Sequence, residues 1–343
     1  MRNIYDLSYQ QLAQELNALS EPAFRAAQIF DWLYKKNVRS FDDMRNLSVD
    51  LRGKLQEAFE IQHLTVDHHG RSSDETQKIL FKLSDLEHIE TVLIPTSTRA
   101  TVCVSTQAGC KFGCRFCASG IGGWKRNLTP GEILAQVLHM KKIADGQGRP
   151  VSHIVFMGVG EPLDNYENLM SAIRVINDEK AINIGARRIT VSTCGVIPKI
   201  HALAQEGLQI ELAISLHGYD NESRDVLMPV NKKYPFDDLM DACREYIAKT
   251  KRQITFEYIL IKDVTCSPQA IQSLKKAFKG LICKMNLIPY NPVSEFDHQT
   301  PSRQEMFAFK DQLETFGIHA TIRAPRGRDV NAACGQLRHS TQK

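Results

Sequence analysis

The sequence predicts an α/β protein whose main domain consists of six strand and helix units around a parallel sheet. From Thr101 onwards, short runs of β-branched and apolar residues alternate with longer stretches of helical periodicity, which is the pattern of βα units. Six such units fall short of the eight that close a barrel. The chain before this region has a different character, so we expect smaller elements in front of the main domain.

The six units can be placed along the chain. We expect strands at 101–106, 152–158, 188–193, 211–217, 253–261 and 283–290. We expect helices at 130–143, 165–178, 198–205, 236–249, 268–279 and 301–316. Because active sites of parallel sheets lie at the carboxyl ends of the strands, functional residues should follow these strands.

Two smaller elements precede the main domain. Residues 1–60 have the pattern of short helices with two apolar stripes, formed by Leu12, Leu16 and Leu19 and by Ala26, Ile29, Phe30 and Leu33. Segments 77–83 and 88–95 are rich in β-formers and are separated by a polar break, which predicts a β-hairpin. We therefore divide the chain into a helical docking domain (1–60), a β-rich linker (61–98), the main domain (99–330) and a C-terminal loop and tail (331–343).

The composition is that of an ordinary globular protein, with 43% hydrophobic and 24% charged residues among 343. No apolar stretch approaches the roughly 20 residues that a membrane helix needs, and no secretory signal is visible at the start. We expect a cytoplasmic protein with reduced cysteines and no membrane partner.

The net charge of +4 is small, but the basic residues gather in two places. One group flanks residues 110–117 and the other extends from Arg323 to the C-terminus: Lys111, Arg115, Lys125 and Arg126, then Arg323, Arg326, Arg328, Arg338 and Lys343. Two such patches suit a phosphate-rich substrate. Two solvated faces are the alternative interpretation.

The most informative motif is CKFGCRFC, in which Cys110, Cys114 and Cys117 are spaced as CxxxCxxC. Three thiolates at this spacing can hold three irons of a 4Fe-4S cluster and leave the fourth iron open. A structural zinc site needs four ligands, usually as two close pairs, and the sequence has no second pair. The odd number of nine cysteines disfavours a disulfide framework. We favour the cluster, with zinc binding and a plain structural role as alternatives.

Other candidate residues lie outside this motif. Gly160 and Glu161 follow the second strand, and glycine lets the backbone approach a ligand closely. Short polar residues stand at the ends of the third, fourth and sixth strands: Ser192, Ser215, His217 and Asn291. They suit hydrogen bonds to a polar ligand, although turn and capping roles are equally open. Cys103 and Cys334, taken alone, are small residues of the kind that cores contain.

Nine segments together resemble one family. They are CVSTQAGCKFGCRFCA (103–118), KRNLT (125–129), GVGEPLDN (158–165), STCGVIPKI (192–200), AISLH (213–217), MPVNKKYP (228–235), FEYILI (256–261), NLIPYNP (286–292) and AACGQL (332–337). With FRAAQIFDWLYKK (24–36), they are similar to the RlmN/Cfr family of radical S-adenosylmethionine (SAM) RNA methyltransferases over nearly the whole chain. Val159 and Cys194 depart conservatively from the family pattern, and Pro162 favours the RlmN branch.

The resemblance implies an open six-unit partial TIM barrel, the radical SAM core. It implies one 4Fe-4S cluster on Cys110, Cys114 and Cys117, with SAM on the open iron. The implied SAM-binding residues are Gly160, Glu161, Ser192, Ser215, Leu216, His217 and Asn291. The implied catalytic residues are Cys334, Cys103 and, as a proton acceptor, Glu90.

The resemblance further implies methylation of adenine carbon 2 in 23S rRNA and in tRNA beside the anticodon. Two SAM molecules are used per turnover: one methylates Cys334, and the other yields the radical that activates this methyl group. Cys103 then releases the product by forming a disulfide with Cys334. An electron donor such as flavodoxin or ferredoxin and a monomeric state are expected. The alternatives are methylation at carbon 8, as in Cfr, a radical SAM activase or maturase acting on a protein, and a non-enzymatic iron–sulfur or zinc module.

Overall fold

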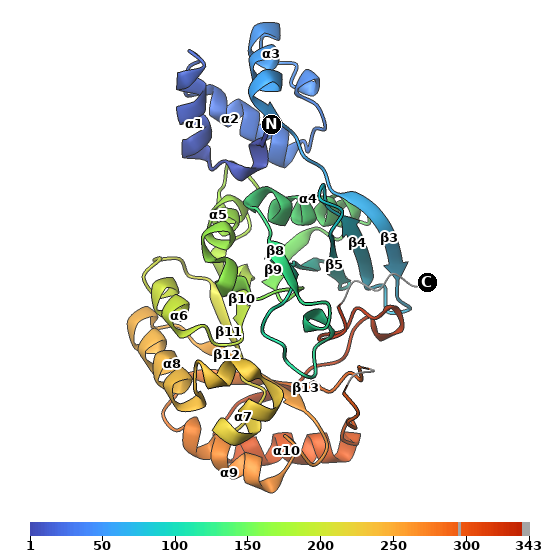
Figure 1. Cartoon of the computed structure of the whole chain (residues 1–343), viewed down its shortest axis with the longest axis vertical. Coiled ribbons are helices and arrows are strands. Elements are labelled where there is room, and N and C mark those ends of the chain that lie inside the picture. Colours follow the sequence, from blue (N-terminus) through green and yellow to red (C-terminus); the bar gives the residue numbers. More distant parts are fainter. Residues whose placement is uncertain (294–295, 338–343) are drawn as a thin grey trace.

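The computed structural model describes residues 1–293 and 296–337 and is built around one ten-stranded sheet (Figure 1). Seven of its strands run parallel, in the order in which they occur in the chain. They are β6 (Ala100–Cys103), β9 (Val151–Phe156), β10 (Ile189–Thr193), β11 (Glu211–Ser215), β12 (Ile254–Leu260), β13 (Cys283–Pro289) and β14 (Ala320–Ile322). The sheet is open, with β14 at one edge and β3 at the other.

Helices connect the parallel strands close to the predicted positions. They are α4 (Pro130–Gly146), α5 (Tyr166–Asn177), α6 (Ile197–Leu203), α8 (Phe236–Thr250), α9 (Pro268–Ala277) and α10 (Arg303–Thr315). Local sequence explains their starts: Thr129 and Glu132 form a capping box around Pro130 at the start of α4. The short helix α7 (Asn221–Leu227), capped by Asp220, was not predicted.

Several predicted strands extend too far at their carboxyl ends. The first was expected to reach residue 106 but ends at Cys103, and the second ends at Phe156 rather than at 158. The fourth ends at Ser215, two residues before the predicted end. In each case the residues that follow leave the hydrogen-bonded ladder and form a loop. These loops carry the candidate site.

The predicted hairpin is confirmed as the antiparallel pair β4 (Gln77–Lys82) and β5 (His88–Pro95). It is joined by a further strand, β3 (Thr65–Arg71), that was not predicted. Strand β5 pairs with β6, so that Val92 lies opposite Cys103. The hairpin therefore continues the main sheet, and its last strand borders the first parallel strand.

The N-terminal segment forms a cluster of short helices at one end of the molecule (Figure 1). Its helices are α1 (Tyr9–Ala18), α2 (Arg25–Phe30), a π-helical turn (Asp31–Lys35) and α3 (Val49–Ala58). Seven residues were predicted to form its apolar stripes, and all of them except Leu19 are fully or almost fully buried. The cluster contacts α4, where the backbone N–H of Gly131 donates to Asp6 (2.8 Å). A Cβ atom at Gly131 would lie 2.3 Å from the Asn3 amide, so this contact requires glycine.

A buried glutamine on α4 fixes the loop after β6. The Oε1 atom of Gln136 accepts from the N–H of Ser105 (2.9 Å) and from the Thr91 hydroxyl (2.7 Å), and its Nε2 donates to the Ser105 carbonyl (3.0 Å). The Ser105 hydroxyl donates to the Glu90 carbonyl (2.5 Å) and accepts from the N–H of Val159 (2.9 Å). This network holds β5 and the loops after β6 and β9 in fixed relative positions. None of the described helices is long and apolar enough to cross a bilayer.

Candidate active site

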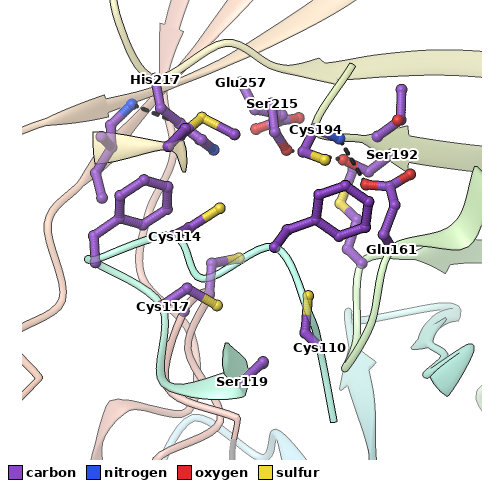
Figure 2. A pocket seen from close by; sticks show the side chains of 18 of the residues that line it. Cys110, Cys114, Cys117, Ser119, Glu161, Ser192, Cys194, Ser215, His217 and Glu257 are labelled. Carbon is purple, nitrogen blue, oxygen red and sulfur yellow. Dashed lines mark hydrogen bonds between the residues drawn. The ribbon is translucent and has the colours of Figure 1, made fainter. Parts of the chain in front are cut away.

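A cavity opens at the carboxyl ends of the parallel strands, where the sequence predicted the site (Figure 2). Its walls come from the cysteine loop, from the loops after successive strands and from the C-terminal loop. Nine predicted site residues line it: Cys110, Cys114, Cys117, Gly160, Glu161, Ser192, Ser215, His217 and Cys334. Leu216 is buried in the core, Asn291 lines a neighbouring pocket, and Cys103 and Glu90 belong to neither lining.

The cysteine loop lies between the two strands of a small hairpin, β7 (Gln107–Gly109) and β8 (Trp124–Asn127). Gly109 has a left-handed backbone (φ 75°), and a Cβ atom there would lie 1.8 Å from the Gly123 carbonyl oxygen, so the hairpin cannot close around another residue. The N–H of Arg115 donates to the Leu227 carbonyl at the end of α7 (3.0 Å). The loop is therefore attached to the barrel helices as well as to its own hairpin.

The three thiols of this loop are spread around one space in Figure 2. No group of three described His, Cys, Asp or Glu side chains converges closely enough to hold a single metal ion. Zinc requires such convergence, whereas each cysteine of a 4Fe-4S cluster binds its own iron. The arrangement therefore fits a cluster better than it fits zinc.

Burial raises the pKa of all three thiols, to about 12 for Cys110 and well above the usual value for Cys114. The neighbouring thiols of the loop also contribute to the raised pKa values of Cys110 and Cys114. The thiols are consequently protonated at neutral pH without metal, and iron binding must release their protons.

The loop after β9 brings a glycine and a carboxylate to the cavity. Gly160 has φ 103°, and a Cβ atom there would lie 2.6 Å from the side chain of Gln107. The Glu161 carboxylate accepts from the N–H of Leu163 (3.0 Å) and from the N–H of Cys194 (2.7 Å), which joins this loop to the loop after β10. Burial raises the pKa of Glu161, although these two hydrogen bonds favour its charged form.

The next two strands supply a pair of hydroxyls and a neutral imidazole. The Ser192 and Ser215 hydroxyl oxygens lie 3.3 Å apart. His217 has a left-handed backbone (φ 51°), and its Nδ1 accepts from the N–H of Ile259 (3.1 Å), which leaves Nε2 as the protonated nitrogen. Burial lowers the pKa of His217 to about 3. Its ring packs edge-on against Phe116 of the cysteine loop at 4.8 Å.

The C-terminal loop closes over the cysteine loop and carries Cys334, whose side chain is exposed. The Gly335 carbonyl accepts from the N–H of Ala118 (2.7 Å), and the Leu337 carbonyl accepts from the Ser119 hydroxyl (2.7 Å). Asn291 donates its amide N–H to the Cys334 carbonyl (3.0 Å) and accepts from Nε of Arg328 (2.8 Å). In the structure Asn291 thus anchors this loop.

Cys103, on β6, lies beside Leu337 of the C-terminal loop. Its thiol packs in a small apolar cluster with Val92, Val159 and Leu337. Burial and, to a smaller extent, the nearby Cys334 thiol raise its pKa to about 12. Both residues are free thiols in the structure.

Glu90 lies on β5, two residues before the partner of Cys103, so its side chain is on the same face of the sheet as that thiol. It is buried, and Oε1 forms an ion pair with Nζ of Lys78 (2.8 Å). Lys78 also donates to the Asn331 carbonyl (3.2 Å). An ion pair and a hydrogen bond therefore connect Glu90 to the C-terminal loop, in place of the solvated strand face that a single glutamate usually indicates.

The predicted basic patches are only partly available to a ligand. Arg126 donates to both carboxylate oxygens of Glu132 (2.7 and 2.8 Å) and to Asp85 (2.5 Å). Lys111 pairs with Asp164 (2.7 Å). Counting charges along the sequence does not reveal such ion pairs. Arg338 and Lys343 lie outside the described residues.

Sequence reasoning missed two residues of opposite charge type in the cavity, Glu257 and Arg323. Glu257 on β12 accepts from the Asn286 amide (2.9 Å), while its other oxygen has no hydrogen bond and lies 3.8 Å from Nη1 of Arg323. Arg323 was counted with the surface patch, yet it lines the cavity with Cys334. A carboxylate in the otherwise apolar strand FEYILI was the available signal.

We predict that Glu257→Gln changes how stability depends on pH, because burial raises the pKa of Glu257. Near pH 4 and below, this carboxyl is neutral in the folded and unfolded chains alike. At higher pH the unfolded chain releases the proton and the folded chain retains it. The free energy of unfolding therefore falls by up to about 1.4 kcal/mol per pH unit until the folded pKa is reached.

Glutamine does not titrate, so the variant's free energy of unfolding should lack this pH-dependent decrease. Relative to the wild type, the variant should therefore gain stability as pH rises from about 4.5, the ordinary glutamate pKa. Urea unfolding of the iron-free protein across this range measures the difference. Glu245→Gln, at a side chain 70% exposed, is the control and should show no such trend. A stability difference for Glu257→Gln that does not change with pH would contradict the assignment.

Comparison with known proteins agrees with this geometry. Residues 104–268 match the family model of the radical SAM superfamily, and residues 2–61 match that of the ribosomal RNA large subunit methyltransferase N-terminal domain. A solved structure described as a radical SAM methyltransferase from Sphaerobacter thermophilus superposes with a TM-score of 0.95 at 43% identity, covering 98% of this chain and 99% of that one.

Curated relatives extend the match to the whole chain. Proteins of Bacillus cytotoxicus and Halalkalibacterium halodurans, each named a probable dual-specificity RNA methyltransferase RlmN, are 48% identical over 341 residues. The alignments cover 99% of this chain and 94% of each relative. The chain therefore belongs to the RlmN family of radical SAM RNA methyltransferases.

Proposed function

We propose that the protein methylates carbon 2 of an adenine in 23S rRNA and of the adenine beside the anticodon in tRNA. The observation that carries the proposal is the position of two further free thiols near the three-cysteine loop: Cys334 lines the cavity with that loop, and Cys103 lies close to Cys334. In this proposal the parallel strands β6 and β9 to β13, with their helices, act as the open six-unit partial barrel of a radical SAM core. We expect a cytoplasmic monomer that receives electrons from flavodoxin or ferredoxin.

The chemistry of the target atom explains why the cavity needs both a site that generates a radical and a cysteine that carries the methyl group. Carbon 2 of adenine has no lone pair, so direct displacement of the SAM methyl group has no nucleophile to use. When bound at Cys110, Cys114 and Cys117, a 4Fe-4S cluster with SAM supplies a 5′-deoxyadenosyl radical for hydrogen abstraction. The remaining steps depend on the protein's own side chains.

Several cavity groups suit the binding of SAM. Glu161 presents a buried carboxylate for an amino group, and Gly160 leaves room for the ligand to approach the backbone. Ser192 and Ser215 offer hydroxyls, and the neutral His217 offers the N–H of Nε2 as a donor. Leu216 and Asn291 act indirectly in this proposal, by positioning the loops in which they lie.

Cys334 and Cys103 divide the remaining chemistry. The Cys334 thiolate attacks the methyl carbon of one SAM, S-adenosylhomocysteine leaves with the electron pair of the broken sulfur–methyl bond, and Cys334 holds the methyl group beside the base. After hydrogen abstraction, the methylene carbon bonds to carbon 2, which links the RNA covalently to Cys334. A cluster bound at the three cysteines would accept the unpaired electron left by this addition. Cys103 then attacks the Cys334 sulfur: a disulfide forms, and the carbon–sulfur bond breaks so that its electron pair and a proton from solvent complete the methyl group. Glu90, held by Lys78, accepts the proton that leaves the ring.

Analysis of the product tests the function directly. Substrate RNA incubated with the iron-loaded protein, SAM and a reductant should yield 2-methyladenosine on nucleoside mass spectrometry. We expect none with Cys334→Ala, which retains the cluster loop but cannot carry the methyl group. A product containing only 8-methyladenosine would refute the position of methylation, and SAM cleavage without any RNA product would favour an activase.

We predict that Cys103→Ala stalls after the RNA has been linked to Cys334. The residue acts only in release, so SAM cleavage and addition to the base should proceed without it. The measurement is an RNA–protein adduct that survives denaturation and carries a methylene bridge at Cys334. The double variant Cys103→Ala, Cys334→Ala is the control and should give no adduct. Free turnover of the single variant would mean that Cys103 is only a packing residue.

A second basic region suits the docking of RNA better than Arg126 does. A cleft lies where the N-terminal segment meets α4, and its basic side chains are Arg39, His63, His139 and Lys142. No acidic residue is among those that line it. Burial and the charge of Arg39 lower the pKa of both histidines, so an anion in this basic cleft would supply the missing negative charge. We propose that RNA phosphates bind there.

We predict that Arg39→Gln with Lys142→Gln weakens RNA binding and flattens its salt dependence. Each lost phosphate contact should reduce the slope of log K against log salt by about 0.7 to 0.9. Binding titrations at several salt concentrations measure this slope. The control is Lys276→Gln with Lys279→Gln, which changes the net charge by the same amount at the opposite end of the molecule, near α9 (Figure 1). This control should leave the slope unchanged. An equal slope for both double variants would argue against the basic cleft.

A further inference from the structure

Helix α7 carries a fully buried guanidinium next to the cysteine loop. Arg224 has no exposed surface and is the largest fully buried side chain in the described residues. Its helix approaches the loop after β11 so closely that a Cβ atom at Gly218 would lie 2.9 Å from the Arg224 Cα. The same helix ends at Leu227, whose carbonyl accepts from the N–H of Arg115 in the cysteine loop. Arg224 is therefore held rigidly behind the candidate cluster site.

All the hydrogen bonds of this guanidinium go to neutral oxygens. Its Nε donates to the Leu216 carbonyl (3.2 Å), Nη2 to the Cys194 carbonyl (2.5 Å), and Nη1 to Asn231 Oδ1 (2.9 Å) and to the Tyr234 carbonyl (3.2 Å). The salt bridges of the described residues include none to Arg224. The adjacent Asp225 accepts from the Asn231 amide instead (2.8 Å).

A buried charge without a counter-charge is unfavourable, so one is expected nearby. Nη2 of Arg224 donates to the carbonyl of Cys194, and Cys194 lines the cavity together with Cys114, a candidate cluster ligand. The residue after Cys114, Arg115, donates its N–H to the end of α7. We therefore expect the negative charge that balances Arg224 to lie at the cysteine loop.

An iron–sulfur cluster held by three thiolates provides this charge. The thiolates outweigh the positive charge of the oxidised iron–sulfide core, and reduction adds another electron. We infer that Arg224 is the counter-charge of the cluster and favours its reduced form. The inference rests on the proposed cluster assignment and extends it to a positioning residue that touches neither SAM nor RNA.

The experiment compares two variants of the full chain after cluster reconstitution. Arg224→Gln removes the charge but keeps hydrogen-bond donors, whereas Arg224→Lys keeps the charge and loses the planar geometry. Iron and sulfide analysis establishes loading, and a potentiometric titration followed by electron paramagnetic resonance measures the fraction of reduced cluster. Arg244→Gln, on the surface of α8, is the control for loss of one positive charge.

We expect Arg224→Gln to lower the ratio of reduced to oxidised cluster at a given potential by at least tenfold, which is about 59 mV for a one-electron couple. Arg224→Lys should remain within about threefold of the wild type, and Arg244→Gln should not differ from it. A purely structural role for Arg224 would change folding or loading without this dependence on charge.

Two results would overturn the inference. One is an Arg224→Gln protein with full iron content and the potential of the wild type. The other is an Arg224→Lys protein that loads its cluster and shows a tenfold loss of the reduced form, and this result decides the matter even where the glutamine variant does not fold. A wild-type protein that takes up no iron would instead refute the cluster assignment itself.

Discussion

The candidate site depends on one long-range contact, in which the C-terminal loop hydrogen-bonds to the loop that carries the three cysteines. The N–H of Ala118 donates to the Gly335 carbonyl, and the Ser119 hydroxyl donates to the Leu337 carbonyl. These bonds join residues more than 200 positions apart. Gly335 is required because its backbone is left-handed (φ 82°) and packs against the Phe116 carbonyl. Together with the hydrogen bond from Asn291 to the Cys334 carbonyl, this contact sets the position of Cys334 relative to the cavity.

Burial determines the charge of the groups around this cavity. The thiols of the loop and Glu257 have raised pKa values, and His217 has a strongly lowered one, because each loses contact with water. Uncharged side chains therefore surround much of the site, while Arg323 supplies positive charge at its wall and the buried Arg224 supplies it from behind the lining. In such an environment a bound anionic group interacts strongly with each guanidinium, since little solvent screens them.

Sequence reasoning located the main elements because their patterns are local. Alternating strands and helices were recognisable from periodicity, and the hairpin from its β-formers. Helix α7 and strand β14 are only seven and three residues long, too short for a periodic pattern. Strand ends were placed too far along because polar residues such as Ser105 continue a β-rich run, and only the Gln136 network shows where the ladder stops.

Sequence reasoning grouped candidate residues best where each motif lies within one loop. Cys110, Cys114, Cys117 and the Gly160–Glu161 pair share one cavity, as strand-end reasoning requires. Glu257 and Arg323 were missed because their meeting depends on the register of β12, β13 and β14. Arg224 gave no signal, since a charged residue in a short amphipathic helix is normally solvated. Its burial follows from two glycines, Gly195 and Gly218, whose missing Cβ atoms make room for it.

Cys103 and Cys334 have the same functional group, a thiol, but the fold gives them different environments. This difference can determine which thiol reacts first. Only a thiolate attacks carbon or sulfur, and its reactivity depends on pKa and access. Cys103 is 8% exposed, and burial raises its pKa to about 12, so it is protonated and shielded at neutral pH. Cys334 is exposed beside Arg323 and can meet SAM first. In the proposed reaction, premature disulfide formation is therefore suppressed. Release requires Cys103 to lose its proton, and two described groups favour this loss because they lower the pKa of Cys103: the charge of Arg323 and a backbone hydrogen bond at Met157.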